Sequence, residues 1–342
     1  MKTKKRIDYI DVAKGITILL VIIGHSIDFG WKRDLIFSFH MPLFVICSGF
    51  FYKNKSYKEE LSKSFNFLFK PYISWLFIFV MLLFVFDYEI NFANFLINFK
   101  IFLKSVIFSI CAPSPGKLNI NTGIIGGVGS LWFIPMLIVV RLLFLTIDKI
   151  TRGDQFKIFL CTVLISLLGY ILGIKSYYLP FMIDVAMYCI IFYYLGYLLR
   201  KYNIIEKIRL SDFILIILIF IFGFRFSWNE LVNRYYPAFS IINALGGSII
   251  VIKLSFYLSK KINVSILKWI GANTMNILGI HQCDALILFL IFQTSFKSLT
   301  SNLTLNKIYY SLIRICLCVM LSFLIYVVKK IINKSNKKLK IK

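Results

Sequence analysis

An imidazole and a lysine lie on one face of the first apolar stretch of the chain, residues 10–29. At 100° per residue, Lys14 and His25 are about 20° apart around a helix axis and about 16 Å apart along it. An ionisable side chain deep in a bilayer costs about 3 kcal/mol on insertion scales, so this face is expected to line a protein interior or a cavity. Because an imidazole takes up protons near neutral pH, His25 is a candidate general base. Asp11 lies on the same face, and we assign it, together with His25, as a catalytic residue.

The other two histidines, His40 and His281, also fall within or at the edge of apolar stretches. A structural alternative pairs Asp11 with Lys14 and lets Lys14 reach the membrane interface, but it does not account for a histidine at the depth of His25. The proline after His40, in Met41-Pro42, has two interpretations that both stay open. It either turns backbone carbonyls towards a cavity or simply starts a helix.

Three further basic residues interrupt apolar stretches. Arg141 lies at about the depth of Lys14, and two cations at one depth can receive an anion that enters from the cytoplasm. The alternative is again that Arg141 reaches the interface. Lys253 is close enough to the end of its stretch to reach the interface. Arg314 is nearer the external side, where it can contact a substrate.

The elements that carry these residues are predicted to be membrane-spanning helices. The chain has 342 residues, of which 59% are hydrophobic and 16% charged, and no water-facing surface hides that much apolar area. We expect an all-α, polytopic bundle of about ten transmembrane helices. The predicted spans are 10–29, 35–51, 71–86, 130–147, 157–174, 183–199, 211–227, 238–257, 272–292 and 308–328. Residues 92–110 are predicted to form an amphipathic helix on the membrane face.

The charge of the chain is basic, with 40 Lys and Arg against 15 Asp and Glu. Most of these cations fall on the segments that a cytoplasmic N-terminus would place inside, so the positive-inside rule puts both termini in the cytoplasm. This explains the charge without nucleic acid. We expect one transmembrane domain, residues 1–328, and a basic cytoplasmic tail, residues 329–342, that lies against anionic lipid. The 7 cysteines show no metal-ligand spacing, so no metal is expected.

Several motifs resemble membrane acyltransferase family 3, the O-acetyltransferases of bacterial surface sugars. Lys14 and His25 fit its first-helix signature of a basic residue, ten others and a histidine. The motifs that follow, in the order of the family, are Phe39-His-Met-Pro-Leu-Phe44, Lys70-Pro-Tyr-Ile-Ser-Trp75, Gly129-Ser-Leu-Trp-Phe133, Tyr194-Leu-Gly-Tyr-Leu-Leu-Arg200 and Ile270-Gly-Ala-Asn-Thr-Met-Asn276 with His281. The motif that starts at Phe39 is most similar to fucose 4-O-acetylase-like proteins.

The resemblance implies an enzyme of the bacterial cytoplasmic membrane that moves an acetyl group from cytoplasmic acetyl-CoA to a carbohydrate hydroxyl. His25 would be the essential catalytic residue, and Lys14, Arg141 and Lys70 would bind the donor. His40, Trp132, Asn276 and His281 are assigned to the carbohydrate acceptor. The chain departs from the family in having lysine at position 14, where arginine is common. It also lacks an arginine-rich first cytoplasmic loop, and has only Lys53, Lys55, Lys58, Lys63 and Lys70 there.

A second hypothesis is a transporter or flippase for a polysaccharide precursor, in which the buried charges line a translocation path. The sequence shows no inverted repeat and no matching pair of Gly/Pro-broken helices in two halves, which favours the enzyme. A third hypothesis is a catalytically silent family member that acts as a membrane scaffold.

Overall fold

The computed structural model describes residues 8–26, 31–87, 100, 103, 129–175, 179–222, 237–292 and 303–339, and all regular structure in these segments is helical. The α-helices are α1 (Asp8–Ser26), α2 (Trp31–Phe37), α3 (His40–Phe50), α4 (Tyr57–Ser64), α5 (Lys70–Asp87), α7 (Phe133–Ile150), α8 (Gln155–Ile174), α9 (Ile183–Lys201), α10 (Ile204–Lys207), α11 (Leu210–Phe222), α12 (Pro237–Lys261), α13 (Ser265–Ala272), α14 (Thr274–Phe292) and α15 (Leu303–Leu339). A π-helical segment, Phe65–Phe69, joins α4 to α5. The predicted amphipathic helix 92–110 lies almost entirely outside the described residues.

Among the described residues, eight helices, or pairs of continuous helices, are long and apolar enough to cross a membrane. They match eight of the ten predicted spans and confirm a polytopic helical membrane protein. The remaining two predicted spans, 211–227 and 272–292, correspond to α11 and α14. Of these, α11 has only 13 residues, and α14 is not among the eight. The cytoplasmic location of the termini stays a prediction.

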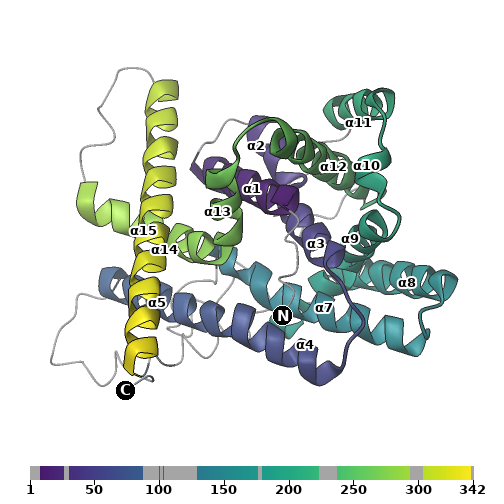
Figure 1. Ribbon diagram of the computed structural model, residues 1–342, viewed down its shortest axis with the longest axis horizontal. Helices are drawn as coiled ribbons and strands as arrows, with labels where there is room; N and C mark the ends of the chain where they lie inside the picture. The colour runs from purple at the N-terminus through teal and green to yellow at the C-terminus, as the bar shows by residue number, and fades with distance from the viewer. Residues whose placement is uncertain are drawn as a thin grey trace.

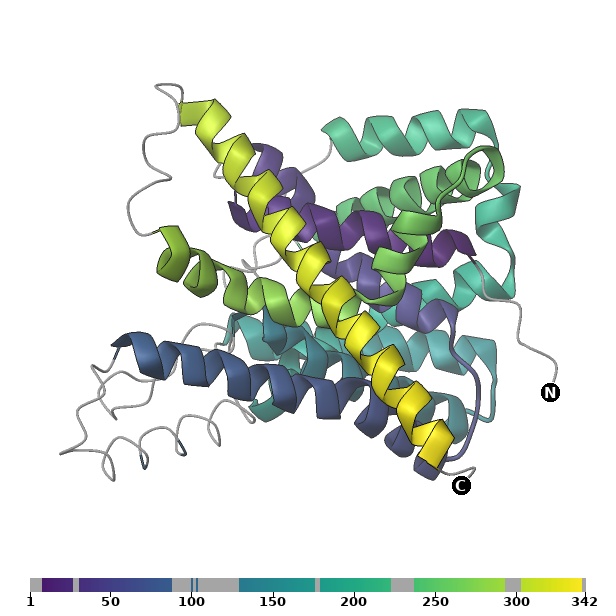
Figure 2. The same ribbon diagram turned by 60° about the vertical axis from the view of Figure 1, so that its left-hand side comes forward.

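Consecutive long helices alternate in direction, and most run side to side in the view of Figure 2. Helix α1 is near the centre of the bundle, where it contacts α3, α12, α13, α14 and α15 (Figure 1). Glycines allow two of the closest approaches. A Cβ atom on Gly271 would overlap the carbonyl of Asp11, and one on Gly49 would overlap the carbonyl of Tyr193. Small residues at such crossings let membrane helices pack backbone against backbone, which fixes α1 against α13 and α3 against α9.

Helix α15 crosses the bundle obliquely (Figure 2) and has 37 residues. Its membrane-spanning part is Leu305–Asn333, and the helix continues to Leu339. The basic residues from Lys329 onward, predicted as a separate tail, therefore extend the same helix as far as it is described. The side chains of Lys329–Asn333 are exposed, as expected for a segment at the membrane surface.

The prediction that Lys253 reaches the membrane interface is wrong. Its side chain is 2% exposed, and its Nζ donates a hydrogen bond of 2.6 Å to the carbonyl of Ile205 in α10. Such a bond satisfies a carbonyl at a short helix and compensates the buried ammonium. Lys253 therefore ties α12 to α10.

Candidate functional site

A cavity of about 340 Å³ opens between α1, α3, α4, α7 and α14. Five basic side chains line it, from α1, the segment after α3, α4 and the middle of α7. They are Lys14, Lys53, Lys55, Lys63 and Arg141. Because α1 and α4 begin at the end of the bundle where α3 and α7 finish, these cations gather at one end. Further along, the lining is apolar and includes Ile18, Val21, Phe133 and Leu278.

Glu60 is the carboxylate that lines this basic end, and it was not singled out from the sequence. It is 4% exposed, accepts a hydrogen bond of 2.6 Å from Nε of Arg141, and forms an ion pair with Lys55. The sequence carried one signal for it. Ser56 and Glu59 form a capping box that starts α4, and this turns the next residue towards the bundle. Glu60 therefore holds two of the five cations in place, while the cavity keeps an excess of positive charge.

The structure places Lys14 and Arg141 in the lining of one cavity. Asp11 forms an ion pair of 2.7 Å with Lys14. The carboxylate is 14 residues, about 21 Å along the helix axis, from His25. Asp11 therefore positions Lys14 and does not contact the imidazole with which it was grouped.

Lys70, the third predicted donor-binding residue, lies elsewhere. Its side chain is exposed, and its Nζ is 5.3 Å from the ring centroid of Phe65. It is not part of the cavity lining described by the structure. Lys53, Lys55 and Lys63 line the cavity instead: the first two lie in the segment between α3 and α4, and the third lies in the last turn of α4.

A second buried carboxylate supports the mouth of the cavity. Asp148 is 6% exposed and accepts hydrogen bonds from the Tyr52 hydroxyl, at 2.5 Å, and from the Asn54 amide, at 2.8 Å. Burial, followed by this hydrogen bond, raises the pKa of Tyr52 above its usual range. Tyr52 thus stays a neutral donor at physiological pH and fixes the chain between α3 and α4.

Two helix faces that line the cavity continue to histidines, and the third histidine adjoins a lining residue. The lining residues nearest to the histidines are Val21 on α1, Leu278 on α14, and Met41, which directly follows His40 at the start of α3. His25 and His281 follow the first two at spacings of four and three residues, which keeps them on the same faces. The rings of His25 and His281 lie with centroids 5.3 Å apart, and Phe37 packs between His25 and His40 at 5.0 and 4.7 Å. The histidines therefore cluster one helical turn beyond the cavity.

The three imidazoles differ in access and in hydrogen bonding. His25 is exposed in the last turn of α1, whereas His40 and His281 are buried. Nδ1 of His40 lies 3.0 Å from the carbonyl oxygen of Ile36, so it carries the proton and donates. His25 is thus the imidazole that a hydroxyl group from outside can approach, and its edge contacts with other rings hold it inside the bundle.

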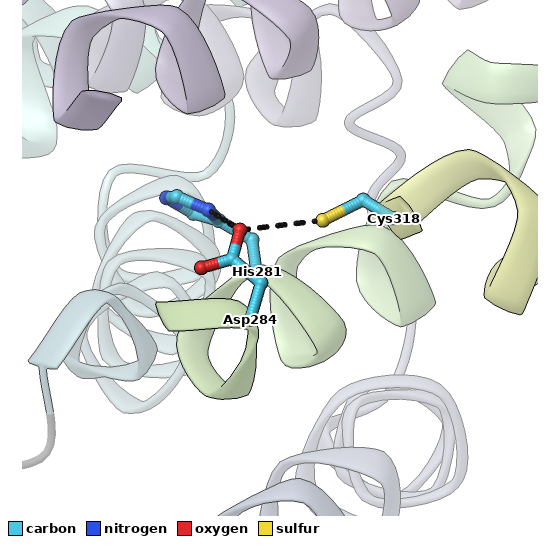
Figure 3. A group of neighbouring side chains, drawn as sticks. All are labelled: His281, Asp284 and Cys318. Atoms are coloured by element: carbon cyan, nitrogen blue, oxygen red, sulfur yellow. Dashed lines mark hydrogen bonds and ion pairs between the residues drawn. The ribbon is translucent and has the colours of Figure 1, made fainter. Parts of the chain in front are cut away.

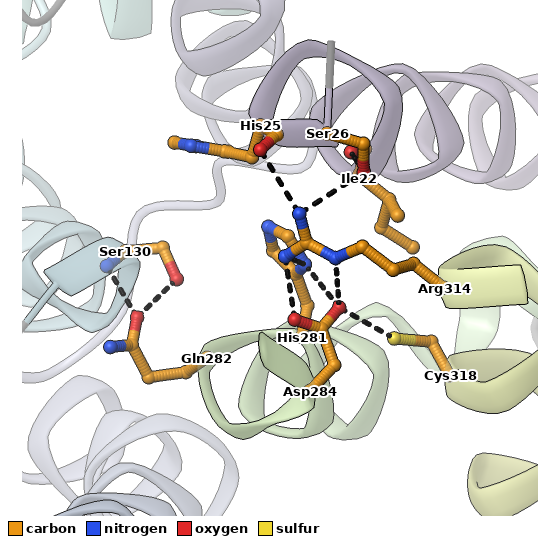
Figure 4. A network of polar contacts seen from close by, with 9 residues as sticks. All are labelled: Ile22, His25, Ser26, Ser130, His281, Gln282, Asp284, Arg314 and Cys318. Atoms are coloured by element: carbon orange, nitrogen blue, oxygen red, sulfur yellow. Dashed lines mark hydrogen bonds and ion pairs between the residues drawn. The ribbon is translucent and has the colours of Figure 1, made fainter. Parts of the chain in front are cut away.

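A buried ionic network lies next to this cluster (Figure 4). Arg314 donates to both oxygens of Asp284, from Nε at 3.0 Å and from Nη2 at 2.5 Å. Nδ1 of His281 lies 2.9 Å from Oδ2 of the same carboxylate. Arg314 was predicted to contact a substrate. In the structure it is only 5% exposed, and its partner is Asp284.

Three atoms of this region have the chemistry of metal ligands. The candidate atoms of His281, Asp284 and Cys318 lie within 4.8 Å of one another (Figure 3). However, the guanidinium of Arg314 donates to both carboxylate oxygens, so a metal ion would have to displace it from a bidentate pair. The contacts favour an ion-pair network over a metal site.

The remaining predicted acceptor residues lie at two places. Trp132 is buried at the start of α7, next to Ser130, whose backbone N–H and hydroxyl both donate to Oε1 of Gln282 at 2.6 and 2.7 Å (Figure 4). This joins α7 to α14 beside the histidines. Asn276 is in the first turn of α14, directly after two residues that line the cavity, and is five residues, about 7.5 Å along the helix axis, before His281.

The fold and the site define a polytopic helical membrane protein in which a basic cavity ends about one helical turn from a cluster of imidazoles. A family model described as an acyltransferase domain, acyltransferase family 3, matches residues 7–327. The chain belongs to this family and is a membrane acyltransferase. Searches of curated proteins and of solved structures found no match.

Proposed function

We propose that the protein is an O-acetyltransferase of the bacterial cytoplasmic membrane. It takes acetyl groups from cytoplasmic acetyl-CoA and transfers them to a hydroxyl of a surface or exported carbohydrate. The observation that carries the proposal is the continuity between the basic cavity and the histidine cluster, which lie on the same faces of α1 and α14. A donor held by cations at one end can present its thioester at the other.

The donor end suits a phosphorylated carrier. Acetyl-CoA has several anionic phosphate oxygens at one end and a thin, largely uncharged arm at the other. Lysine and arginine bind phosphate through charge-assisted hydrogen bonds, and five of them line this cavity. The apolar lining beyond them suits the arm, and the volume of about 340 Å³ lies in the range of small-molecule sites.

The histidine end suits proton transfer. In the proposed reaction His25 takes the proton from the acceptor hydroxyl while the oxygen attacks the thioester carbonyl. The tetrahedral intermediate collapses, the carbon–sulfur bond breaks, and the CoA thiolate takes up the proton from His25. The products are an acetyl ester and free CoA. Because His25 is exposed at the end of α1 away from the basic residues, donor and acceptor approach from opposite directions.

The resemblance to fucose 4-O-acetylase-like proteins suggests a sugar hydroxyl as the acceptor. Trp132 and His40 are the proposed acceptor-binding residues, since an aromatic face packs against a sugar ring and an imidazole binds its hydroxyls.

Mass spectrometry of surface glycans from cells with and without the protein tests the function. We expect acetyl groups only where the protein is present. The H25A variant, at equal membrane abundance and with unchanged thermal unfolding, should lose them. Normal acetylation by H25A would refute the role of His25, and identical glycans with and without the protein would refute the proposed acceptor class.

A further inference from the structure

The ion pair between Asp284 and Arg314 is buried, and it touches the two helices that bear His25 and His281. Asp284 is 0% exposed and Arg314 5% exposed. The same guanidinium donates from Nη1 to the backbone carbonyl of His25 at 3.0 Å and to the Ser26 hydroxyl at 3.1 Å. One cation on α15 therefore links the last turn of α1 to the carboxylate on α14.

We infer that Asp284 and Arg314 are positioning residues, which hold His281 as a neutral hydrogen-bond acceptor beside the ring of His25. The inference rests on the proposed function and deepens it. It gives His281, assigned from the sequence to the acceptor sugar, a role towards the catalytic imidazole instead.

The hydrogen bonds around Asp284 set the tautomer of His281. Both oxygens of the carboxylate already accept N–H groups of Arg314, so the carboxylate is an acceptor towards its remaining neighbours. Nδ1 of His281 lies 2.9 Å from Oδ2 of this acceptor and 3.3 Å from Nη2 of Arg314, which can only donate. The shorter contact, with the carboxylate, requires the ring proton on Nδ1, and in the neutral ring this leaves a lone pair on Nε2. Figure 4 shows that this second nitrogen is turned away from Asp284, towards the end of α1 that bears His25.

The position of His281 matters when His25 takes a proton. A protonated imidazole has two N–H donors, and a neighbouring lone pair stabilises it. The centroid distance of 5.3 Å puts the two rings within reach of such a contact. A carboxylate that orients an imidazole in this way is known to affect catalysis far more than binding. Asp284 acts through His281, and His281 acts through His25.

Arg314 contributes by fixing the distance between the two helices. Its charge lies at the C-terminal end of α1, where free carbonyls and the helix dipole favour a cation. Ser26 accepts from Arg314 and donates to the carbonyl of Ile22 at 2.6 Å, so its hydroxyl is satisfied in both directions. Loss of the guanidinium would free the last turn of α1 and, with it, His25.

The experiment uses the fact that the chain has only 3 histidines. The full-length protein, labelled with 15N-histidine and reconstituted in nanodiscs, gives three imidazole spectra, which H40N and H281N assign. We expect the Nδ1–H tautomer for His281 in the wild type and its loss in D284N. In the acetyl-transfer assay D284N should lower kcat by about 10²-fold or more and leave KM for acetyl-CoA unchanged.

A single charge change in a buried pair can unfold the protein, so a double variant is needed. D284N/R314Q removes both charges and should fold, yet keep the kcat defect of D284N. D184N is the matched control, because Asp184 is another buried carboxylate, 1% exposed, on α9. It should keep the wild-type spectrum and kcat.

A wild-type kcat in D284N/R314Q, or an unchanged His281 tautomer in D284N, would overturn the inference. A rise in KM equal to the fall in kcat/KM would overturn it as well, because it would mean that the variant only weakens binding. If the wild type transfers no acetyl group, the proposed function fails. The spectra then still decide, on their own, whether Asp284 sets the tautomer of His281.

Discussion

Replacing Arg141 tests whether the basic cavity binds the donor or only balances Glu60. Nε of Arg141 is bound to Glu60, and two readings of this contact predict opposite results. In the first, Glu60 holds a guanidinium that contacts a phosphate of acetyl-CoA. In the second, Arg141 is present only to neutralise a carboxylate that is 4% exposed. The variants R141M, E60Q and E60Q/R141M separate the two.

The size of the effect follows from the contacts. A hydrogen bond to a charged group contributes about 1.5–3 kcal/mol, so the loss of one donor contact in R141M should weaken acetyl-CoA binding by about 10- to 150-fold. E60Q removes the negative charge among five cations and should strengthen donor binding. If Arg141 contacts the donor, the double variant binds weakly, within about tenfold of R141M. If Arg141 only neutralises Glu60, the double variant binds as the wild type does.

The assay is equilibrium binding of radiolabelled acetyl-CoA to protein in nanodiscs at several salt concentrations, since screening weakens charge interactions. K157M is the control, because Lys157 is basic and 67% exposed at the same end of the bundle, outside the cavity. It should bind as the wild type. Wild-type affinity in E60Q/R141M would refute the reasoning that Arg141 binds the donor.

Three further predictions follow from the packing and the cavity. G49A should destabilise the fold by about 1–3 kcal/mol, because its Cβ overlaps a backbone carbonyl of α9, and should lower the thermal midpoint; G246A, whose Cβ meets its nearest neighbour at 3.6 Å, should not. Q282L should lower the midpoint by removing two hydrogen bonds to the start of α7, about 1–3 kcal/mol in all; an unchanged midpoint would contradict this. K14A should raise KM for acetyl-CoA about tenfold and K14R should restore it, measured by initial rates; equal KM values would show that Lys14 does not contact the donor.

The sequence predicted much of the bundle because the length and hydropathy of an apolar stretch are enough to identify a membrane-spanning helix. Helical geometry also placed Lys14 and Arg141 at one depth, since both positions depend only on residue counts along a helix. The start of α4 was missed because polar residues dominate it. Its capping box at Ser56 was the local signal: the helix that starts there carries Glu60 to the cavity, and Lys55, just before the helix, pairs with Glu60.

The network around Asp284 depends on tertiary structure, so no local pattern predicts its geometry. Arg314 lies 30 residues from Asp284 and reaches it from another helix. There was a usable signal, however. Asp284 and Arg314 are opposite charges within two successive apolar stretches. They are expected to pair because neither charge is tolerated alone in hydrocarbon. Lys253 was misplaced for a related reason, since its partner is a backbone carbonyl, which sequence does not mark.

The most direct test of the account is acetyl transfer across a sealed bilayer. Purified protein is reconstituted into vesicles that enclose surface glycan from the source cells, and radiolabelled acetyl-CoA is added outside only. The account predicts that label reaches the enclosed glycan with the wild type and stays outside with H25A. Labelling by H25A at the wild-type rate, or none with a folded wild type that binds acetyl-CoA, would contradict the claim that an acetyl group passes from the basic cavity to the histidine cluster.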